Sequence, residues 1–300
     1  MGSTFSLFAL TAVSYQRKRG RWQDRVEWLE TAYKQIQHGA DSHLKGRLMH
    51  EMGAVYSDLG RKDEALCQFT AALLALREVG DRGGEGTTLN NIALVYSALG
   101  RKEEALRRFE EALLVRREVG DRDGEGTTLN NIAFVYDTLG HTEEALRRYE
   151  EALLVLREVG DRGGEGTTLN NIAGVYFTLG RNEEALRRYE EALLVRREVG
   201  DRRGEGTTLN NIAFVYSALG RKEEAVRRYE EALSVVQEVG DRWREALVWA
   251  NIGWVLKELG SFAEAVEALE RCVALAEALG HPDLAINRAK LEHVRAKLQS

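Results

Sequence analysis

Residues 84–93 read GEGTTLNNIA, and the same ten letters return at 124–133, 164–173 and 204–213. The copies are 40 residues apart, and a fixed period in this range is typical of a repeat protein. Two series of glycines keep the same period through most of the chain, and the second series is offset from the first by half a period. The two series are Gly20, Gly60, Gly100, Gly140, Gly180, Gly220 and Gly260, and Gly80, Gly120, Gly160, Gly200, Gly240 and Gly280.

Each half-period has the length of a short helix and its connection. Residues 81–99 and 101–119 both carry apolar side chains at three- and four-residue spacing, which predicts one buried face on each of two helices. These positions include Leu89, Ile92, Ala93, Tyr96, Leu99, Ala105, Leu106, Phe109, Ala112 and Leu113. Gly80 suits a left-handed helix end, and Asp81 suits the N-cap of the next helix. We call the first helix of each repeat helix A and the second helix B.

The recurring positions resemble the signature of the tetratricopeptide repeat (TPR) family. In the third repeat they are Leu89, Ile92, Ala93, Tyr96, Gly100, Ala105, Phe109 and Ala112. The period of 40 and Arg117, where the family often has Pro, are similar to the longer TPRs of Pins/LGN and kinesin light chain and to bacterial arrays beside STAND-type ATPases and caspase-like proteases. The resemblance implies an all-α, right-handed α-solenoid of about seven TPR hairpins with a C-terminal cap helix.

The repeat register also predicts the organisation of the chain. Residues 1–40 keep Gly20 in register but have Gln16 where a Tyr belongs, which indicates a degenerate first TPR that acts as an N-terminal cap. Residues 41–280 hold six regular 40-residue TPRs. Residues 281–300 are expected to form the cap helix, with Leu291, Val294 and Leu298 on its apolar face.

Composition excludes several classes of partner. The formal net charge of -6 argues against general binding to nucleic acid, which needs a basic surface. No apolar run is long enough to cross a membrane, so we expect no membrane partner. The two cysteines, Cys67 and Cys272, cannot form a disulfide framework, and we expect a cytoplasmic protein with one exposed and one buried thiol.

Comparison among the repeats separates packed positions from open ones. The positions of Val95 and Leu99 keep the same residue in every regular repeat, so both are predicted to pack. Two other positions change from small to large side chains, which a packed core does not accept without cavities or strain. The first holds Ala54, Leu94, Phe134, Gly174, Phe214 and Trp254, and the second holds Ser57, Ser97, Asp137, Phe177, Ser217 and Lys257. We call the side of helix A that carries these positions the variable face and expect it to border a binding groove.

One asparagine per repeat shares the variable face. These residues are Asn91, Asn131, Asn171, Asn211 and Asn251. An amide both donates and accepts, so a regular series suits the backbone of an extended peptide. The TPR resemblance implies a concave wall here, where Asn holds ligand backbone or carboxylate. The candidate peptide- or protein-binding residues are these asparagines with Leu94, Phe134, Gly174, Phe177, Phe214 and Trp254. Alternatively, Asn90 or Asn91 bonds to the next repeat and stabilises the stack.

Other chemistry finds no support in the sequence. The GEG segment lacks the further Gly and the Lys-Ser/Thr of a phosphate loop, and Gly84 and Gly86 are expected to allow close approach to the preceding helix B. The six histidines include no i,i+4 pair and are interpreted as incidental. We therefore expect no catalytic residues, no metal and no cofactor, and hence no enzyme.

Three functions remain open. The first is a scaffold that binds a protein or peptide as an extended segment in the groove. The second is a sensor or regulatory module of a multidomain signalling protein, such as a STAND ATPase or a caspase-like protease system. The third is a scaffold that self-associates, with homo-oligomers formed by end-to-end stacking of the array.

Overall fold

The structure is a computed structural model that describes residues 22–36, 41–280 and 282–299, and these ranges contain helices and turns and no strand. The chain divides into two compact units, residues 1–159 and 160–300. The first unit contains α2 (Trp22–Ile36), α3 (Ser42–Asp58), α4 (Lys62–Glu78), α5 (Arg82–Ala98), α6 (Lys102–Val119), α7 (Arg122–Thr138) and α8 (Thr142–Val159). The second contains α9 (Arg162–Thr178), α10 (Asn182–Glu198), α11 (Arg202–Ala218), α12 (Lys222–Glu238), α13 (Arg242–Glu258), α14 (Phe262–Leu279) and α15 (Leu284–Gln299).

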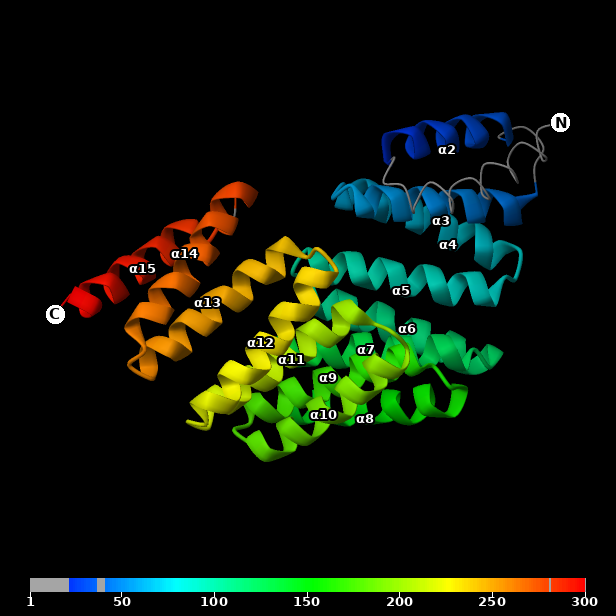
Figure 1. Cartoon of the computed structure of the whole chain (residues 1–300). Helices are drawn as coiled ribbons and strands as arrows, with labels where there is room; N and C mark the ends of the chain where they lie inside the picture. The colour runs from blue at the N-terminus through cyan, green and yellow to red at the C-terminus, as the bar shows by residue number, and fades with distance from the viewer. Residues whose placement is uncertain (1–21, 37–40, 281, 300) are drawn as a thin grey trace. The chain divides into compact units, whose positions relative to one another are not determined.

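Within each unit, consecutive helices pack as hairpins (Figure 1). In the first unit the hairpins are α3–α4, α5–α6 and α7–α8, and in the second they are α9–α10, α11–α12 and α13–α14. Neighbouring hairpins also touch through their A helices, because α5 contacts both α3 and α7, and α11 contacts both α9 and α13. The predicted all-helical solenoid of hairpin repeats is confirmed.

The ends of the helices follow the predicted capping residues. Asp81 precedes α5, and its Oδ1 atom accepts a hydrogen bond of 2.8 Å from the backbone N–H of Gly84. Gly80 and its equivalents adopt left-handed backbone conformations, with φ of 73° at Gly80. The predicted helices at 81–99 and 101–119 correspond closely to α5 and α6.

The glycines of the GEG segment allow two different close approaches. A Cβ atom on Gly84 would lie 3.1 Å from Leu76 Cδ2 of α4, so the prediction of contact with the preceding helix is confirmed there. A Cβ atom on Gly86 would instead lie 3.2 Å from Arg116 Cγ of α6. The prediction is wrong for Gly86, whose close neighbour is the following helix, because the start of α5 packs against the end of α6.

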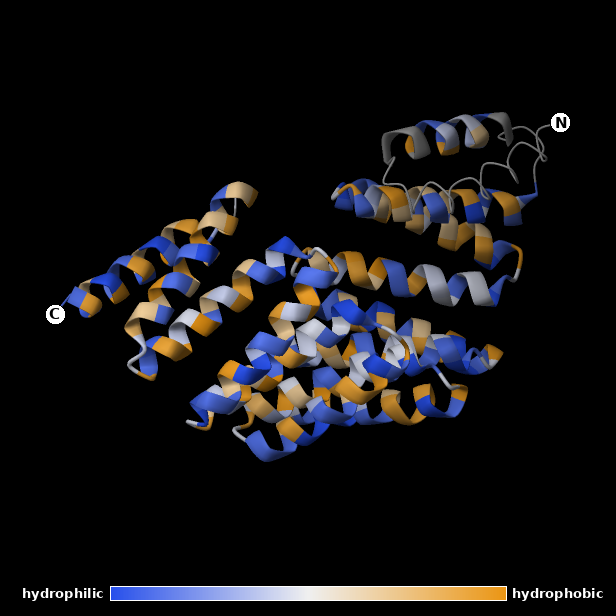
Figure 2. Ribbon diagram, in the orientation of Figure 1, coloured by the Kyte–Doolittle hydropathy of each residue, from blue (hydrophilic) through white to orange (hydrophobic). Residues whose placement is uncertain are grey.

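The core contains most of the predicted residues. Leu89, Ala93 and Phe109 are completely buried, and Val95 and all its equivalents are buried. Leu99 is 40% exposed, so its predicted packing is wrong, whereas its equivalents Leu59 and Leu139 are partly buried and pack against the core. Leu99 is the C-cap residue of α5, where the chain leaves the helix and the core-facing periodicity stops. Figure 2 shows the resulting mixture of hydrophobic and hydrophilic residues along each helix.

Charged residues cover the outer side of helix B, where ion pairs occur at both i,i+3 and i,i+4 spacing. Arg108 bonds to Glu111 at 2.7 Å, and Glu104 bonds to Arg101 at the start of the helix. At the junction between repeats, the buried Glu85 receives a bond of 2.6 Å from Arg77. Because Glu85 is buried, removal of its arginine partners would leave an uncompensated buried charge, which costs more than the loss of an exposed surface pair.

The first and last described helices pack against their neighbours. Helix α2 contacts α3 and buries Leu29, whereas Gly20 and Gln16 of the predicted first repeat lie outside the described residues. Helix α15 contacts α14 and buries Leu291 and Val294. Leu298 is about half exposed, so its predicted place on the buried face is wrong.

No helix among the described residues is long and apolar enough to span a lipid bilayer.

Candidate functional site

The variable face is open, as the comparison among repeats predicts. Leu94 is 43% exposed, and Phe134 is 50% exposed. Phe214 and Trp254 are similarly exposed at equivalent positions in the second unit. At Gly174, an added Cβ atom would have only Tyr189 Oη within 4 Å, at 3.6 Å, so this position also borders open space.

A pocket of about 350 Å³ lies between α5 and α7 in the first unit. Its walls come from the variable face of both helices, and Phe109 of α6 contributes to its floor. The lining residues are Leu94, Ser97, Ala98, Lys102, Phe109, Asn131, Phe134 and Val135. Three of the predicted site residues, Leu94, Asn131 and Phe134, therefore meet in one cavity.

A second pocket, of about 330 Å³, lies between α11 and α13 in the other unit. It is lined by Phe214, Ser217, Ala218, Lys222, Tyr229, Asn251, Trp254, Val255 and Glu258. Eight of these nine residues stand at the positions of the eight residues of the first pocket, three repeats further along the chain. The repeated sequence therefore builds the same pocket twice, and we call the two cavities the α5/α7 pocket and the α11/α13 pocket.

Each pocket contains a lysine that the sequence analysis missed. Lys102 Nζ donates to the Ser97 carbonyl oxygen at 3.2 Å and is 3.1 Å from Ser97 Oγ. Lys222 Nζ reaches Ser217 Oγ at 3.3 Å and also forms an ion pair with Glu258. The signal in the sequence is the spacing Ser-x₄-Lys, which occurs where helix A ends and helix B begins.

The two pockets differ in charge because of one residue. Glu258 neutralises Lys222 in the α11/α13 pocket, and Thr138 stands at the equivalent position beside the α5/α7 pocket. Among the described residues, Lys102 has no carboxylate partner. Burial raises the pKa of the Tyr229 phenol, so this part of the α11/α13 pocket stays neutral. The α5/α7 pocket therefore carries an available positive charge, and the α11/α13 pocket does not.

The asparagines join neighbouring repeats. Asn131 Nδ2 donates to Asn90 Oδ1 at 3.2 Å, and Asn251 Nδ2 donates to Asn210 Oδ1 at 3.0 Å. The same bond, at 3.3 Å, links Asn211 to the preceding repeat. These asparagines therefore do bond between repeats, as the alternative of a role in stabilising the stack predicts.

The asparagine bonds leave capacity for a ligand. A side-chain amide offers two donors and a carbonyl oxygen that can accept two hydrogen bonds. Among the described residues, Asn131, Asn211 and Asn251 each use one N–H, and their carbonyl oxygens have no partner. Asn171 lies partly buried at the same position on α9. Stacking of the repeats and binding of a ligand are therefore compatible.

His50 takes the place of Asn90 in the second repeat. Its Nδ1 atom is 2.9 Å from Thr88 Oγ1, and its Nε2 atom is 3.3 Å from Asn91 Nδ2. Burial lowers the pKa of His50 to about 4. The interpretation of His50 as incidental is therefore wrong, since a neutral imidazole connects two repeats here.

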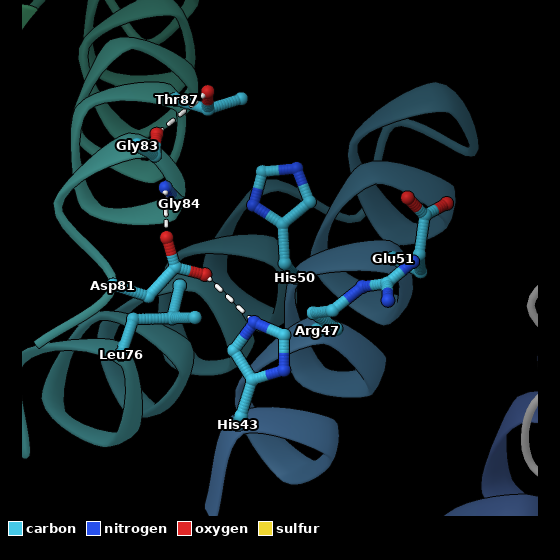
Figure 3. A pocket seen from close by; sticks show the side chains of 9 residues that line it. All are labelled: His43, Arg47, His50, Glu51, Leu76, Asp81, Gly83, Gly84 and Thr87. Carbon is cyan, nitrogen blue, oxygen red and sulfur yellow. Dashed lines mark hydrogen bonds and ion pairs between the residues drawn. The ribbon is translucent and has the colours of Figure 1, made fainter. Parts of the chain in front are cut away.

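A further open pocket, of about 310 Å³, surrounds His50 and is shown in Figure 3. Asp81 occupies one side, where its carboxylate accepts from the Gly84 N–H and lies 3.0 Å from His43 Nε2. Its polar groups are mostly engaged in helix capping and in contacts between repeats. Geometrically, this pocket is part of the repeat junction.

Aromatic side chains on the variable face also contact one another. The rings of Phe177 and Phe214 meet edge to face, with 5.3 Å between their centroids. Lys257 Nζ lies 3.8 Å from the centre of the Trp254 ring. Five of the predicted site residues line neither the α5/α7 nor the α11/α13 pocket, and these are Asn91, Asn171, Gly174, Phe177 and Asn211.

Within the described ranges, no group of three or more His, Cys, Asp or Glu side chains is placed to hold a metal ion. Cys67 is exposed and Cys272 is buried, as predicted. Burial raises the pKa of the Cys272 thiol to about 11, so this thiol stays protonated at neutral pH.

Comparison with protein families identifies the repeats. The model of the tetratricopeptide repeat matches residues 84–158, 164–238 and 223–278, which together make up more than half of the chain. The chain belongs to the tetratricopeptide repeat family. Comparison with the sequences of curated proteins gives no match.

Several solved structures share the fold. BtubC (BKLC) from P. vanneervenii is 22% identical with a TM-score of 0.67, over 73% of this chain and 92% of that chain. The apo form of RapI is 14% identical with a TM-score of 0.71, over 96% and 99% of the two chains. The Rap conjugation gene regulator of plasmid pLS20, solved in complex with a Phr peptide, is 17% identical with a TM-score of 0.62, over 93% and 75%. At these identities the likeness concerns the fold.

Proposed function

We propose that this chain is a non-enzymatic cytoplasmic scaffold that binds a protein or peptide as an extended segment along the variable face. The observation that carries the proposal is the pair of equivalent pockets, each formed by an asparagine, a lysine and exposed apolar side chains. We retain residues 1–40 and 281–300 as the proposed caps of the six regular repeats.

The repeated asparagines suit the backbone of such a segment. Each asparagine occupies the same position on its helix A, and the free carbonyl oxygens of Asn131 and Asn251 can accept hydrogen bonds from backbone N–H groups. A peptide backbone offers donors and acceptors at regular intervals, whatever its side chains. The asparagines would therefore supply affinity without choosing among partners.

The pockets would select the side chains of the partner. In the α5/α7 pocket, Lys102 lies beside Leu94 and Phe134, so an acidic side chain with an aliphatic stem fits both the charge and the apolar walls. In the α11/α13 pocket, the Lys222–Glu258 pair is already neutral, and a larger apolar side chain fits beside Trp254. The two sites would thus read different side chains.

The comparisons support a peptide as the ligand. The Rap regulator of pLS20 has a similar fold over most of this chain, and its structure was solved in complex with a peptide.

The test begins with peptides selected from a random library on the wild-type chain. We expect the affinity of the selected peptides to fall in Asn131→Ala and Phe134→Ala and to stay unchanged in Arg188→Ala, an outer-face control bonded to Glu191. Truncation of an aromatic anchor is expected to cost about 2 kcal/mol or more in binding. Loss of affinity only in Arg188→Ala would place the site on the outer face and contradict the proposal.

A further inference from the structure

Another pocket in the second unit, of about 300 Å³, lies among α12, α13 and α14, the helices that Figure 1 draws in yellow and orange. It borders Trp249, Ile252 and Leu256 of α13, whereas the α11/α13 pocket borders Asn251, Trp254 and Val255. Since these two sets lie on different sides of one helix, the pocket is separate from the variable face. We call it the Ala268 pocket, after the residue on α14 that lines it.

Comparison with the preceding repeat shows what is missing from this pocket. Arg228 of α12 extends to α10, where its Nη2 atom lies 2.6 Å from Glu190 Oε1. One repeat later, Ala268 stands at the position of Arg228 and Glu230 at the position of Glu190. The carboxylate is therefore kept, and the arginine that would reach it is replaced by a methyl group.

The first unit contains the same arrangement. Arg148 Nη2 lies 3.4 Å from Glu110 Oε1, at positions equivalent to Arg228 and Glu190. Two repeats in separate units thus place a guanidinium between neighbouring B helices, against the same glutamate. Both equivalent positions of the next repeat, Glu230 and Ala268, line the Ala268 pocket.

The charge of the pocket is negative. Glu230, Glu264 and Glu267 line it, together with one cation, Arg271. Arg271 Nη2 bonds to Glu267 at 2.6 Å, and its guanidinium lies 4.7 Å from the centre of the Trp249 ring. Neither Glu230 nor Glu264 has a partner among the described residues, so two carboxylates remain for a ligand.

The apolar part of the pocket matches the stem of an arginine. Val226, Leu233 and Ile252 line it beside Trp249. Long cationic side chains bury their methylene groups against such surfaces and keep the charged end at a carboxylate. We propose that the Ala268 pocket binds an arginine side chain of a partner protein, in the place that the chain's own arginine fills in other repeats.

The test uses N-acetyl-arginine amide as the probe and the indole N–H signal of Trp249 in NMR as the readout. We expect a saturable shift of this signal with the arginine probe and none with the matched citrulline derivative, which has the same stem without the charge. An equal response to citrulline or to N-acetyl-lysine amide would overturn the assignment to arginine, as would the absence of a saturable shift.

Two variants test the geometry. Glu230→Gln should weaken binding of the probe about ten-fold or more, since it removes a charge-assisted hydrogen bond. The matched change Glu190→Gln, in the pair already filled by Arg228, should leave the affinity unchanged. Ala268→Arg should restore the internal pair, keep the fold and abolish binding. Unchanged binding in both Glu230→Gln and Ala268→Arg would refute the proposal. That result would leave the proposed binding of a peptide along the variable face standing, because the two sites are separate.

Discussion

Phe109 and Phe134 line the same pocket, yet replacing each by Ala should change the stability of the chain by very different amounts. Phe109 is completely buried, and loss of such a ring leaves a cavity in the core. We expect Phe109→Ala to lower the free energy of unfolding by about 3–5 kcal/mol. Phe134 is 50% exposed, and half of the value for a fully buried side chain is about 1 kcal/mol, with no closed cavity left behind.

The measurement is urea unfolding followed by far-UV circular dichroism. Because a repeat array can unfold in steps, amide hydrogen exchange of α5 to α7 provides the local comparison. For a selected peptide, Phe134→Ala should weaken binding about 30-fold, the equivalent of about 2 kcal/mol. Equal losses of stability in the two variants would show that Phe134 belongs to the core, and the assignment of the variable face as a binding surface would fail.

Three further changes test the packing, the asparagine bonds and the histidine. Gly174→Ala should stabilise the chain by about 1 kcal/mol through helix propensity. Gly206→Ala should not stabilise it, because a Cβ atom at position 206 would lie 2.9 Å from Val236 Cγ1, and thermal unfolding of the two variants measures the difference. Asn90→Ala should cost about 1 kcal/mol in urea unfolding, since it removes the acceptor of Asn131, and no loss would mean that this bond is not formed. Burial lowers the pKa of His50 to about 4 in the folded chain, so the unfolded chain takes up this proton at a higher pH than the folded chain does. The free energy of unfolding should therefore fall by up to about 3 kcal/mol between pH 6.5 and 4. His50→Asn should lose this part of the pH dependence, and an unchanged pH dependence in that variant would refute the prediction.

The sequence was sufficient for the fold because each local signal agrees with the period. Gly80 can end a helix in the left-handed conformation, Asp81 can cap the next helix, and both recur every 40 residues. The open positions were also predictable, since one site that holds both Gly174 and Trp254 cannot be a packed core. Residues 94, 134, 214 and 254 accordingly lie exposed beside pockets.

Other features depend on distances that a helical period does not contain. Leu99 continues the apolar face, but the helix ends one residue earlier and leaves it partly exposed. Lys102 stands in the first turn of helix B, and it enters the pocket because the turn at Gly100 lets it reach back to Ser97. Whether Asn131 meets Asn90 or only a ligand depends on the spacing between neighbouring A helices, which the structure supplies.

Departures from the repeated sequence are informative because the other repeats act as internal controls. His50 replaces an asparagine but keeps both bonds to the next repeat, so that change preserves a contact within the chain. Ala268 replaces an arginine and keeps neither its bond nor its volume, while Glu230 remains. Loss of one partner of a charged pair usually destabilises a protein when the other partner is buried and left alone. At the Ala268 pocket the remaining carboxylate faces an open cavity, where solvent or an incoming guanidinium can satisfy it. A repeat that has lost its own arginine can therefore be stable alone and still be complementary to the arginine of a partner.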